Sequence, residues 1–283
     1  MFNPSEILIQ AGIQRLQTGY RQTFGSYPPE VMALLSEVAR TALGAIARSD
    51  APYHDLDHTL LVTLVGQDIL RGKHLKEGNV TPQDWLNAIV ALLCHDVGYI
   101  RGACADDQPA ARRYATGSGS APVTLPPGTT DASLTPYHVN RSQQFVEENF
   151  ADHPLLCVET VKRNIEATRF PVVEVGDAAR NPYPALVRAA DLVGQLSDPL
   201  YLQKLPALFR EFEEIGANQK FGYRRPEDLR RGFPAFYRAA VAPHVQEAIR
   251  YLRVTPEGRK VVAHLCHNLR QAGQEQTLNF MAA

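Results

Sequence analysis

The stretch DWLNAIVALLCHD, residues 84–96, decides the fold prediction. Its apolar side chains cover almost the whole circumference of a helix, which is typical of a helix buried in a core. Thr81-Pro82-Gln83-Asp84 supplies a capping threonine, a proline at the first helical position and an acid three residues after the cap. The sequence therefore predicts a buried helix that begins near Asp84 and ends at about His95.

Working outward from this helix, the dominant period of the chain is helical. Residues 5–18 and 28–43 each carry an apolar stripe, and Asp198-Pro199 and Thr255-Pro256 each begin a further amphipathic run. The best short strand candidate is Val172 to Val175. No linker divides the chain, so we predict one all-α domain over residues 1–283, with a core at about 28–215 and helical extensions at both ends.

Residues 102–136 interrupt the helical pattern because they are rich in Gly, Pro, Ser, Thr and Ala. A segment of this length inside a compact domain is usually a functional loop or disordered, so we predict a long loop that could cover a pocket. Residues 171–184 and 215–234 are interpreted as shorter connections.

Composition argues against several classes of function. The 283 residues carry a net charge of −1, with 45% hydrophobic and 21% charged residues, which gives no global signature of nucleic-acid or membrane binding. The four cysteines show no CxxC spacing, so they predict no disulfide framework. We expect a cytoplasmic protein with no membrane partner and no stable nucleic-acid complex; the composition does not indicate an oligomeric state.

Ionisable residues at three places could carry chemistry. His54 and His58 are four residues apart and would share one face of a helix. His95-Asp96 ends the apolar helix, where a metal would satisfy both side chains, although a solvated helix end is the alternative. Asp191 lies alone in an apolar helical run, where pairing with Arg188 one turn earlier is the alternative.

Taken together, these residues predict a metal site. Two imidazoles and two carboxylates on separate helices form a mixed nitrogen and oxygen site. Such a site suits one or two divalent ions, with zinc, manganese, magnesium or iron as candidates.

At these residues the chain resembles the HD superfamily of metal-dependent phosphohydrolases, whose pattern is His … His-Asp … Asp. It is most similar to the catalytic domain of the cyclic-nucleotide phosphodiesterases, over residues from about 50 to 215. The similar elements are Pro52-Tyr53-His54-Asp55-Leu56-Asp57-His58, Ala91-Leu92-Leu93-Cys94-His95-Asp96-Val97, Tyr137-His138-Val139-Asn140, Ile165-Glu166-Ala167-Thr168 and Ala189-Ala190-Asp191-Leu192.

The resemblance implies an all-α, phosphodiesterase-like helical bundle with the metal at the bottom of a pocket. It implies metal ligation by His58, His95, Asp96 and Asp191, with Asp96 also able to bridge to a second ion. It further implies a phosphoric ester hydrolase in which the metal generates hydroxide and His54 acts as general acid on the leaving oxygen. The expected substrate is a small phosphorylated anion, and a nucleotide is one candidate.

The chain departs from the phosphodiesterase pattern at several positions. Gly98-Tyr99 stand where that family has Asp-His, and Arg169 stands where it usually has Asp. The family's purine-binding glutamine is replaced by Arg230 or Phe233, depending on the alignment, and neither can form the paired hydrogen bonds of an amide. These departures argue against cyclic AMP or cyclic GMP as the substrate.

Three residues are candidates for contact with the substrate phosphate: His138, Arg141 and Arg169. The guanidinium fork suits phosphate oxygens, and an ordinary surface position is the alternative for each residue.

Two other functions stay open. An HD-fold di-iron oxygenase would need two further histidines between Asp96 and Asp191, for which His138 and His153 are available. His153 precedes Pro154 at an expected helix start, which is a poor position for a ligand. A catalytically inactive HD-fold binding protein is the other alternative.

Overall fold

The computed structural model describes residues 3–119, 121–172 and 181–281, with residues 275–281 described by their backbone alone. Apart from one short hairpin, the regular structure in these residues is helical, which confirms the predicted all-α class. The α-helices are α1 Pro4–Phe24, α2 Pro29–Ile46, α3 Leu56–Glu77, α4 Pro82–Cys94, α5 His138–Phe150, α6 Val158–Glu166, α7 Tyr183–Leu196, α8 Tyr201–Glu214, α9 Ala217–Phe221, α10 Pro226–Phe236, α11 Ala242–Leu252 and α12 Pro256–Met281. Short 3-10 turns are η1 Val97–Tyr99, η2 Pro109–Ala111 and η3 Asp131–Leu134, and η4 Tyr237–Val241 is a π-helical turn.

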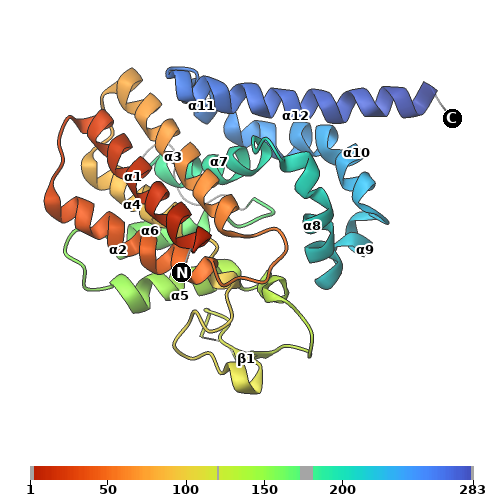
Figure 1. The fold of residues 1–283 in the computed structure, drawn as a ribbon, viewed down its shortest axis with the longest axis horizontal. Helices are drawn as coiled ribbons and strands as arrows, with labels where there is room; N and C mark the ends of the chain where they lie inside the picture. Colours follow the sequence, from red (N-terminus) through yellow and green to blue (C-terminus); the bar gives the residue numbers. More distant parts are fainter. Residues whose placement is uncertain (1–2, 120, 173–180, 282–283) are drawn as a thin grey trace.

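Helix α3 is the centre of the bundle. It packs most extensively against α7 and also contacts α1, α4 and α11 (Figure 1). The α3 and α7 backbones approach closely at Gly194, where an added Cβ would lie 2.7 Å from Cα of Val62. This close approach brings the N-terminal turn of α3 and the middle of α7 to the same part of the core.

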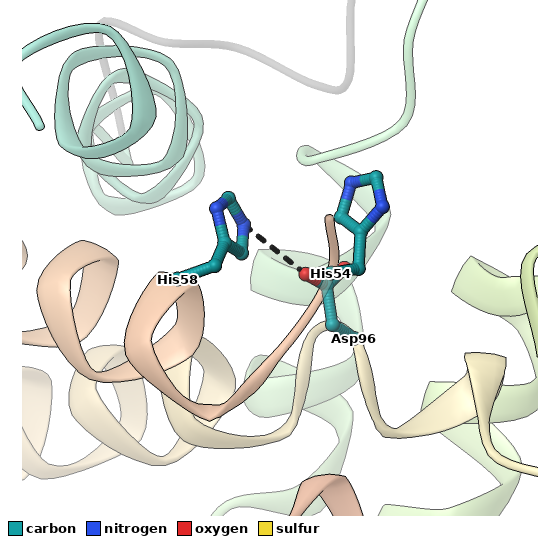
Figure 2. A group of neighbouring side chains, drawn as sticks. All are labelled: His54, His58 and Asp96. Carbon is teal, nitrogen blue, oxygen red and sulfur yellow. Dashed lines mark ion pairs between the residues drawn. The ribbon is translucent and has the colours of Figure 1, made fainter. Parts of the chain in front are cut away.

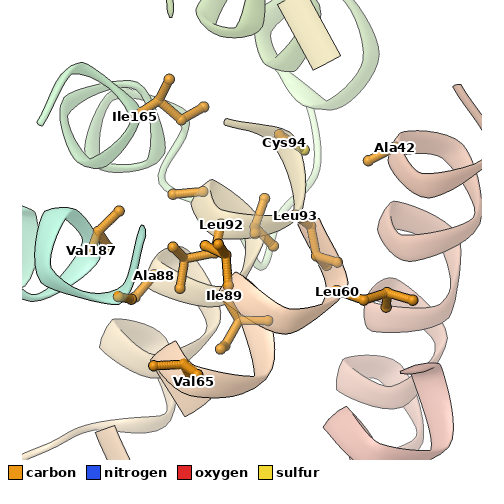
Figure 3. Close-up of a cluster of buried hydrophobic side chains, with 14 of the residues drawn as sticks. Ala42, Leu60, Val65, Ala88, Ile89, Leu92, Leu93, Cys94, Ile165 and Val187 are labelled. Atoms are coloured by element: carbon orange, nitrogen blue, oxygen red, sulfur yellow. The ribbon is translucent and has the colours of Figure 1, made fainter. Parts of the chain in front are cut away.

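The predicted buried helix is α4, and its prediction is confirmed. Thr81 and Asp84 form the expected capping box, and every residue from Trp85 to Cys94 is buried. Side chains of α4 lie in a cluster with residues of α2, α3, α6 and α7 (Figure 3). Because α4 is surrounded by other helices, its C-terminal end is delivered into the protein interior.

Residues 102–136 are more ordered than a plain loop, within the part that the structure describes. They contain η2, η3 and the antiparallel strands β1 Arg113–Tyr114 and β2 Val123–Thr124. This segment lies at one end of the bundle (Figure 1). Its fold is tied to α5 through Asp107, whose carboxylate receives hydrogen bonds from Arg141.

The interpretation of residues 215–234 as a connection is wrong, because this region holds α9 and most of α10. Pro226 stands in the first turn of α10, and Pro234 is tolerated near its end. Leu229 and Phe233, one turn apart, are buried, and the Phe233 ring packs 4.9 Å from that of Tyr201. Tertiary burial therefore outweighs the local signal for a turn.

The ends of the chain contribute to the same core as its middle. The buried cluster includes Ile9 of α1 and Ala272 of α12, and α12 runs along one edge of the molecule (Figure 1). No helix in the described residues is long and apolar enough to cross a membrane. Of the strand candidate Val172 to Val175, the part from residue 173 lies outside the described residues, and Val172 itself is in a turn.

Candidate metal centre

Three structural elements bring the four predicted metal ligands together. His58 lies in the first turn of α3, His95 and Asp96 follow α4 directly, and Asp191 lies on α7. The Nε2 atoms of His58 and His95 are each 3.2 Å from Oδ2 of Asp96. Oδ1 of Asp191 is 3.9 Å from His58 Nε2 and 3.6 Å from His95 Nε2. Figure 2 shows His58 turned toward Asp96.

The donor atoms at this point are buried and have no hydrogen-bond partner outside their own cluster. His58, His95 and Asp96 are 5%, 1% and 4% exposed, which rules out a solvated helix end at His95-Asp96. Nε2 of both histidines and Oδ2 of Asp96 make no hydrogen bond despite their proximity. Buried polar atoms are almost always hydrogen-bonded, because an unpaired one costs about 1–3 kcal/mol. Three such atoms converging on one point therefore form a site that could hold a cation.

The ring orientation of His95 suits metal binding. Its Nδ1 lies 2.8 Å from the carbonyl oxygen of Leu92, which as an acceptor requires the proton on Nδ1. The lone pair of Nε2 is then directed at the site, an arrangement common among histidines that bind metals. The backbone beyond the ring is also fixed, since the Ser142 hydroxyl donates to the carbonyl oxygen of His95 at 2.6 Å.

His54 does not share a helix with His58, contrary to the prediction from their spacing. Asp55 is the N-cap of α3, and its side chain accepts a hydrogen bond from the His58 amide, so the helix begins at Leu56. His54 lies in the turn before the helix, yet its ring is 5.2 Å from that of His58. His54, His58 and Asp96 form a second group that could hold a metal, overlapping the group of His58, His95 and Asp191.

Glu211 of α8 positions His54, and sequence reasoning missed it. Its Oε2 lies 2.6 Å from Nδ1 of His54, while Oε1 accepts hydrogen bonds from the backbone amides of Tyr53 and His54. Burial lowers the pKa of His54, but the carboxylate of Glu211 outweighs burial and raises this pKa to about 9. Only a charged residue facing the core in an amphipathic helix hinted at this role.

The structure removes Arg141 from the candidates for substrate contact. Its side chain is 0% exposed, and its guanidinium donates to both carboxylate oxygens of Asp107. The remaining donors bind the carbonyl oxygens of Gly98, Ala115 and Ile100. All five N–H groups are thus used inside the protein, and Arg141 anchors the 102–136 segment to the bundle instead.

Arg169 and His138 lie in different settings. The guanidinium of Arg169 forms a paired contact with Glu166 and a further one with Asn140, so it is held by internal partners. Nδ1 of His138 lies 2.6 Å from the carbonyl oxygen of Thr135. Burial lowers the pKa of His138, with a partial opposing effect from Asp96, which favours the neutral form of this imidazole.

The remaining histidines do not join the centre. Neither His138 nor His153 belongs to a group of residues in the described chain that could hold a metal. Nδ1 of His153 accepts a hydrogen bond from the Leu155 amide within its own loop. His264 and His267 are exposed on α12.

Comparison with known proteins identifies a family whose model covers almost all of the residues in this fold. A family model described as Npun_R2479-like matches residues 2–275. No curated protein matches the chain significantly. Because the match spans nearly the whole sequence, from α1 into α12, the chain belongs to the Npun_R2479-like family.

Proposed function

We propose that this protein is a metal-dependent phosphohydrolase that cleaves a phosphate ester of a small anionic substrate. The observation that carries the proposal is the convergence of three unpartnered buried donor atoms, from His58, His95 and Asp96, beside the carboxylate of Asp191. The His … His-Asp … Asp order of these residues is also that of the HD phosphohydrolases. Geometry and sequence pattern thus support the same reaction class.

The donor set fits a divalent ion. Two imidazole nitrogens and two carboxylate oxygens suit zinc, manganese, magnesium or iron better than a soft ion that prefers thiolates. Without a bound ion, burial opposes ionisation of Asp96, but the neighbouring imidazoles in their protonated form hold the pKa of its carboxyl well below the usual value. A cation would meet an ionised carboxylate and relieve the unpaired nitrogen atoms at once.

In this proposal the residues of the chain divide the work between binding and proton transfer. A bound divalent ion would supply Lewis acidity, lowering the pKa of a water molecule and stabilising charge on the phosphoryl oxygens. Glu211 holds Nδ1 of His54, which leaves Nε2 as the nitrogen that donates a proton to the departing oxygen. Without a bound ion, the carboxylate of Glu211 raises the pKa of His54 to about 9, which favours the protonated imidazole at neutral pH.

Metal content and turnover, measured on matched variants, test the proposal. The purified protein is expected to contain about one or two divalent ions per chain by elemental analysis. Asp96→Ala should lose both the metal and the hydrolysis of phosphate esters in a screen with added manganese, magnesium or zinc. His54→Asn should keep the metal and lose turnover, whereas loss of metal in this variant would make His54 a ligand instead.

The control is His264→Ala, which removes an exposed histidine of α12. It should change neither the metal content nor the turnover of phosphate esters. Metal binding without hydrolysis of any ester would favour an inactive binding protein. An iron stoichiometry of about two with consumption of oxygen would favour the oxygenase class. Failure to bind any divalent ion would contradict the proposal as a whole.

A further inference from the structure

Three aromatic rings are stacked beside the metal centre. The rings of His54 and Tyr99 lie 4.5 Å apart with an interplanar angle of 15°. Those of Tyr99 and His138 lie 4.4 Å apart at 20°. We call these three residues the ring column. Parallel stacking at both faces of Tyr99 makes it the central member of the column.

His54 needs support from its neighbours because it precedes α3 and is not held by helical backbone. Glu211 binds the ring at Nδ1 only, which fixes one edge but allows the ring plane to tilt about that contact. Tyr53 and His58 meet the ring edge-on or nearly so, at interplanar angles of 78° and 75°. Among these rings, Tyr99 is the one that lies nearly parallel to the His54 ring, so it restricts the tilt.

Tyr99 is itself fixed on both sides. Its side chain is 3% exposed and lies on η1, three residues after Asp96. His138 supports its opposite face, and the contact of His138 with the Thr135 carbonyl oxygen holds that ring in turn. One short turn therefore carries both a candidate metal ligand and the support for the candidate proton donor, which couples their positions.

We propose that Tyr99 is a positioning residue that holds the His54 ring in the plane from which Nε2 serves the leaving oxygen. The inference rests on the proposed phosphohydrolase function and assigns a role to one of the positions where the chain departs from the phosphodiesterase pattern. Tyr99 touches no reacting atom, so its loss should affect the proton-transfer step and leave metal binding intact.

The test compares Tyr99→Leu, Tyr99→Phe and wild type on two substrates. One is an alkyl phosphate ester, whose poor leaving group needs a proton, and the other is the 4-nitrophenyl ester, whose leaving group does not. Tyr99→Leu is expected to lower kcat for the alkyl ester by at least about tenfold, with much less effect on the nitrophenyl ester. Tyr99→Phe keeps the ring and should restore the wild-type ratio of the two rates.

A matched control separates positioning from general damage to the core. Tyr20→Leu removes a ring of the same size from a buried edge-to-face contact with Trp85, in a part of the core that the centre does not use. This variant should lower thermal stability without changing the ratio of the two rates. Equal loss on both esters in Tyr99→Leu, or failure of Tyr99→Phe to restore the ratio, would overturn the inference.

A spectroscopic measurement distinguishes failure of the inference from failure of the proposed function. Imidazole NMR signals of His54 are expected to shift or broaden in Tyr99→Leu and to stay near their wild-type positions in Tyr99→Phe. If the wild-type protein hydrolyses neither ester, the proposed function fails, and unchanged His54 signals in Tyr99→Leu would overturn the positioning role separately.

Discussion

At the scale of single residues, the centre is defined by which atoms lack a partner. His58 Nε2, His95 Nε2 and Asp96 Oδ2 are buried without a hydrogen bond, while the second nitrogen of His95 is occupied by the Leu92 carbonyl oxygen. Most buried polar groups in proteins are hydrogen-bonded. Three buried nitrogen and oxygen atoms without a hydrogen bond at one point are therefore unusual. A bound cation would be contacted by all three atoms at once.

The pair of His54 and Glu211 gives a prediction at this scale. In metal-free protein, imidazole NMR should show His54 titrating near pH 9, and Glu211→Gln should lower its pKa toward the ordinary value of about 6.5. Because the folded-state pKa lies above the unfolded value, this pair stabilises the fold fully below about pH 6.5, and the contribution is lost as pH rises through about 9. In Glu211→Gln, the free energy of unfolding should therefore fall less than in wild type as pH rises from about 6.5 to about 9.

Glu214→Gln is the control for that prediction, because Glu214 lies on the same helix but binds Thr130 and Ser133. It should leave the titration of His54 unchanged. A wild-type midpoint near 6.5, or an equal shift in both variants, would show that Glu211 does not set the pKa of His54.

At the scale of elements, the contact between η1 and α5 places Asp96 and Tyr99. Gly98 stands at this contact, where an added Cβ would lie 1.9 Å from the carbonyl oxygen of His138 and 2.7 Å from the Ser142 amide. Its role is close approach between two backbone segments, and it does not end a helix, since α4 already ends at Cys94. The hydrogen bond from the Gly98 amide to the Ser142 hydroxyl fixes the same contact.

Gly98→Ala should consequently separate η1 from α5. We expect a loss of about 1–3 kcal/mol in the free energy of unfolding, measured by urea denaturation, because neither neighbouring backbone can yield easily. Metal affinity should weaken with it, since Asp96 moves with η1. Gly44→Ala, in α2 with no atom within 4 Å of the added Cβ, is the matched control and should be neutral or stabilising by up to about 1 kcal/mol. A neutral result for Gly98→Ala would contradict this account.

At the scale of the whole molecule, the centre joins parts of the chain that are far apart in sequence. Its candidate ligands come from α3, the end of α4 and α7, and Glu211 adds α8. The Arg141–Asp107 pair, at 2.9 Å, attaches the 102–136 segment beside this assembly. A bound ion would therefore bridge separate elements of one core.

Such bridging predicts a stability that depends on metal. Manganese or zinc at about a hundredfold excess over Kd should stabilise the protein by about 2.7 kcal/mol and raise Tm, as for any ligand that binds only the folded state. A chelator should reverse the increase, and Asp96→Ala should abolish it. His264→Ala should retain it, so an equal response of both variants would indicate metal binding elsewhere on the chain.

The sequence by itself determined the helical class and the identity of the buried helix. The capping box predicts where α4 begins, and the apolar run that follows predicts that the helix is buried. Both local signals therefore indicate the same buried helix. It also indicated His54, His58, His95, Asp96 and Asp191 as candidates, because they stand at element ends or alone in apolar stretches, while the choice of His58 over His54 as a ligand came from the resemblance to the HD pattern. These signals are local, so they can be read from neighbouring residues.

Only the tertiary structure decided how these residues are supported. The partnership of His54 with Glu211 spans 157 residues of sequence, and no local pattern encodes it. Arg141 looked like a phosphate contact because its residue type suits one, but the fold surrounds it with Asp107 and three carbonyl oxygens. Side-chain chemistry predicts what a residue can bind, whereas packing between distant elements decides which of its possible partners it meets.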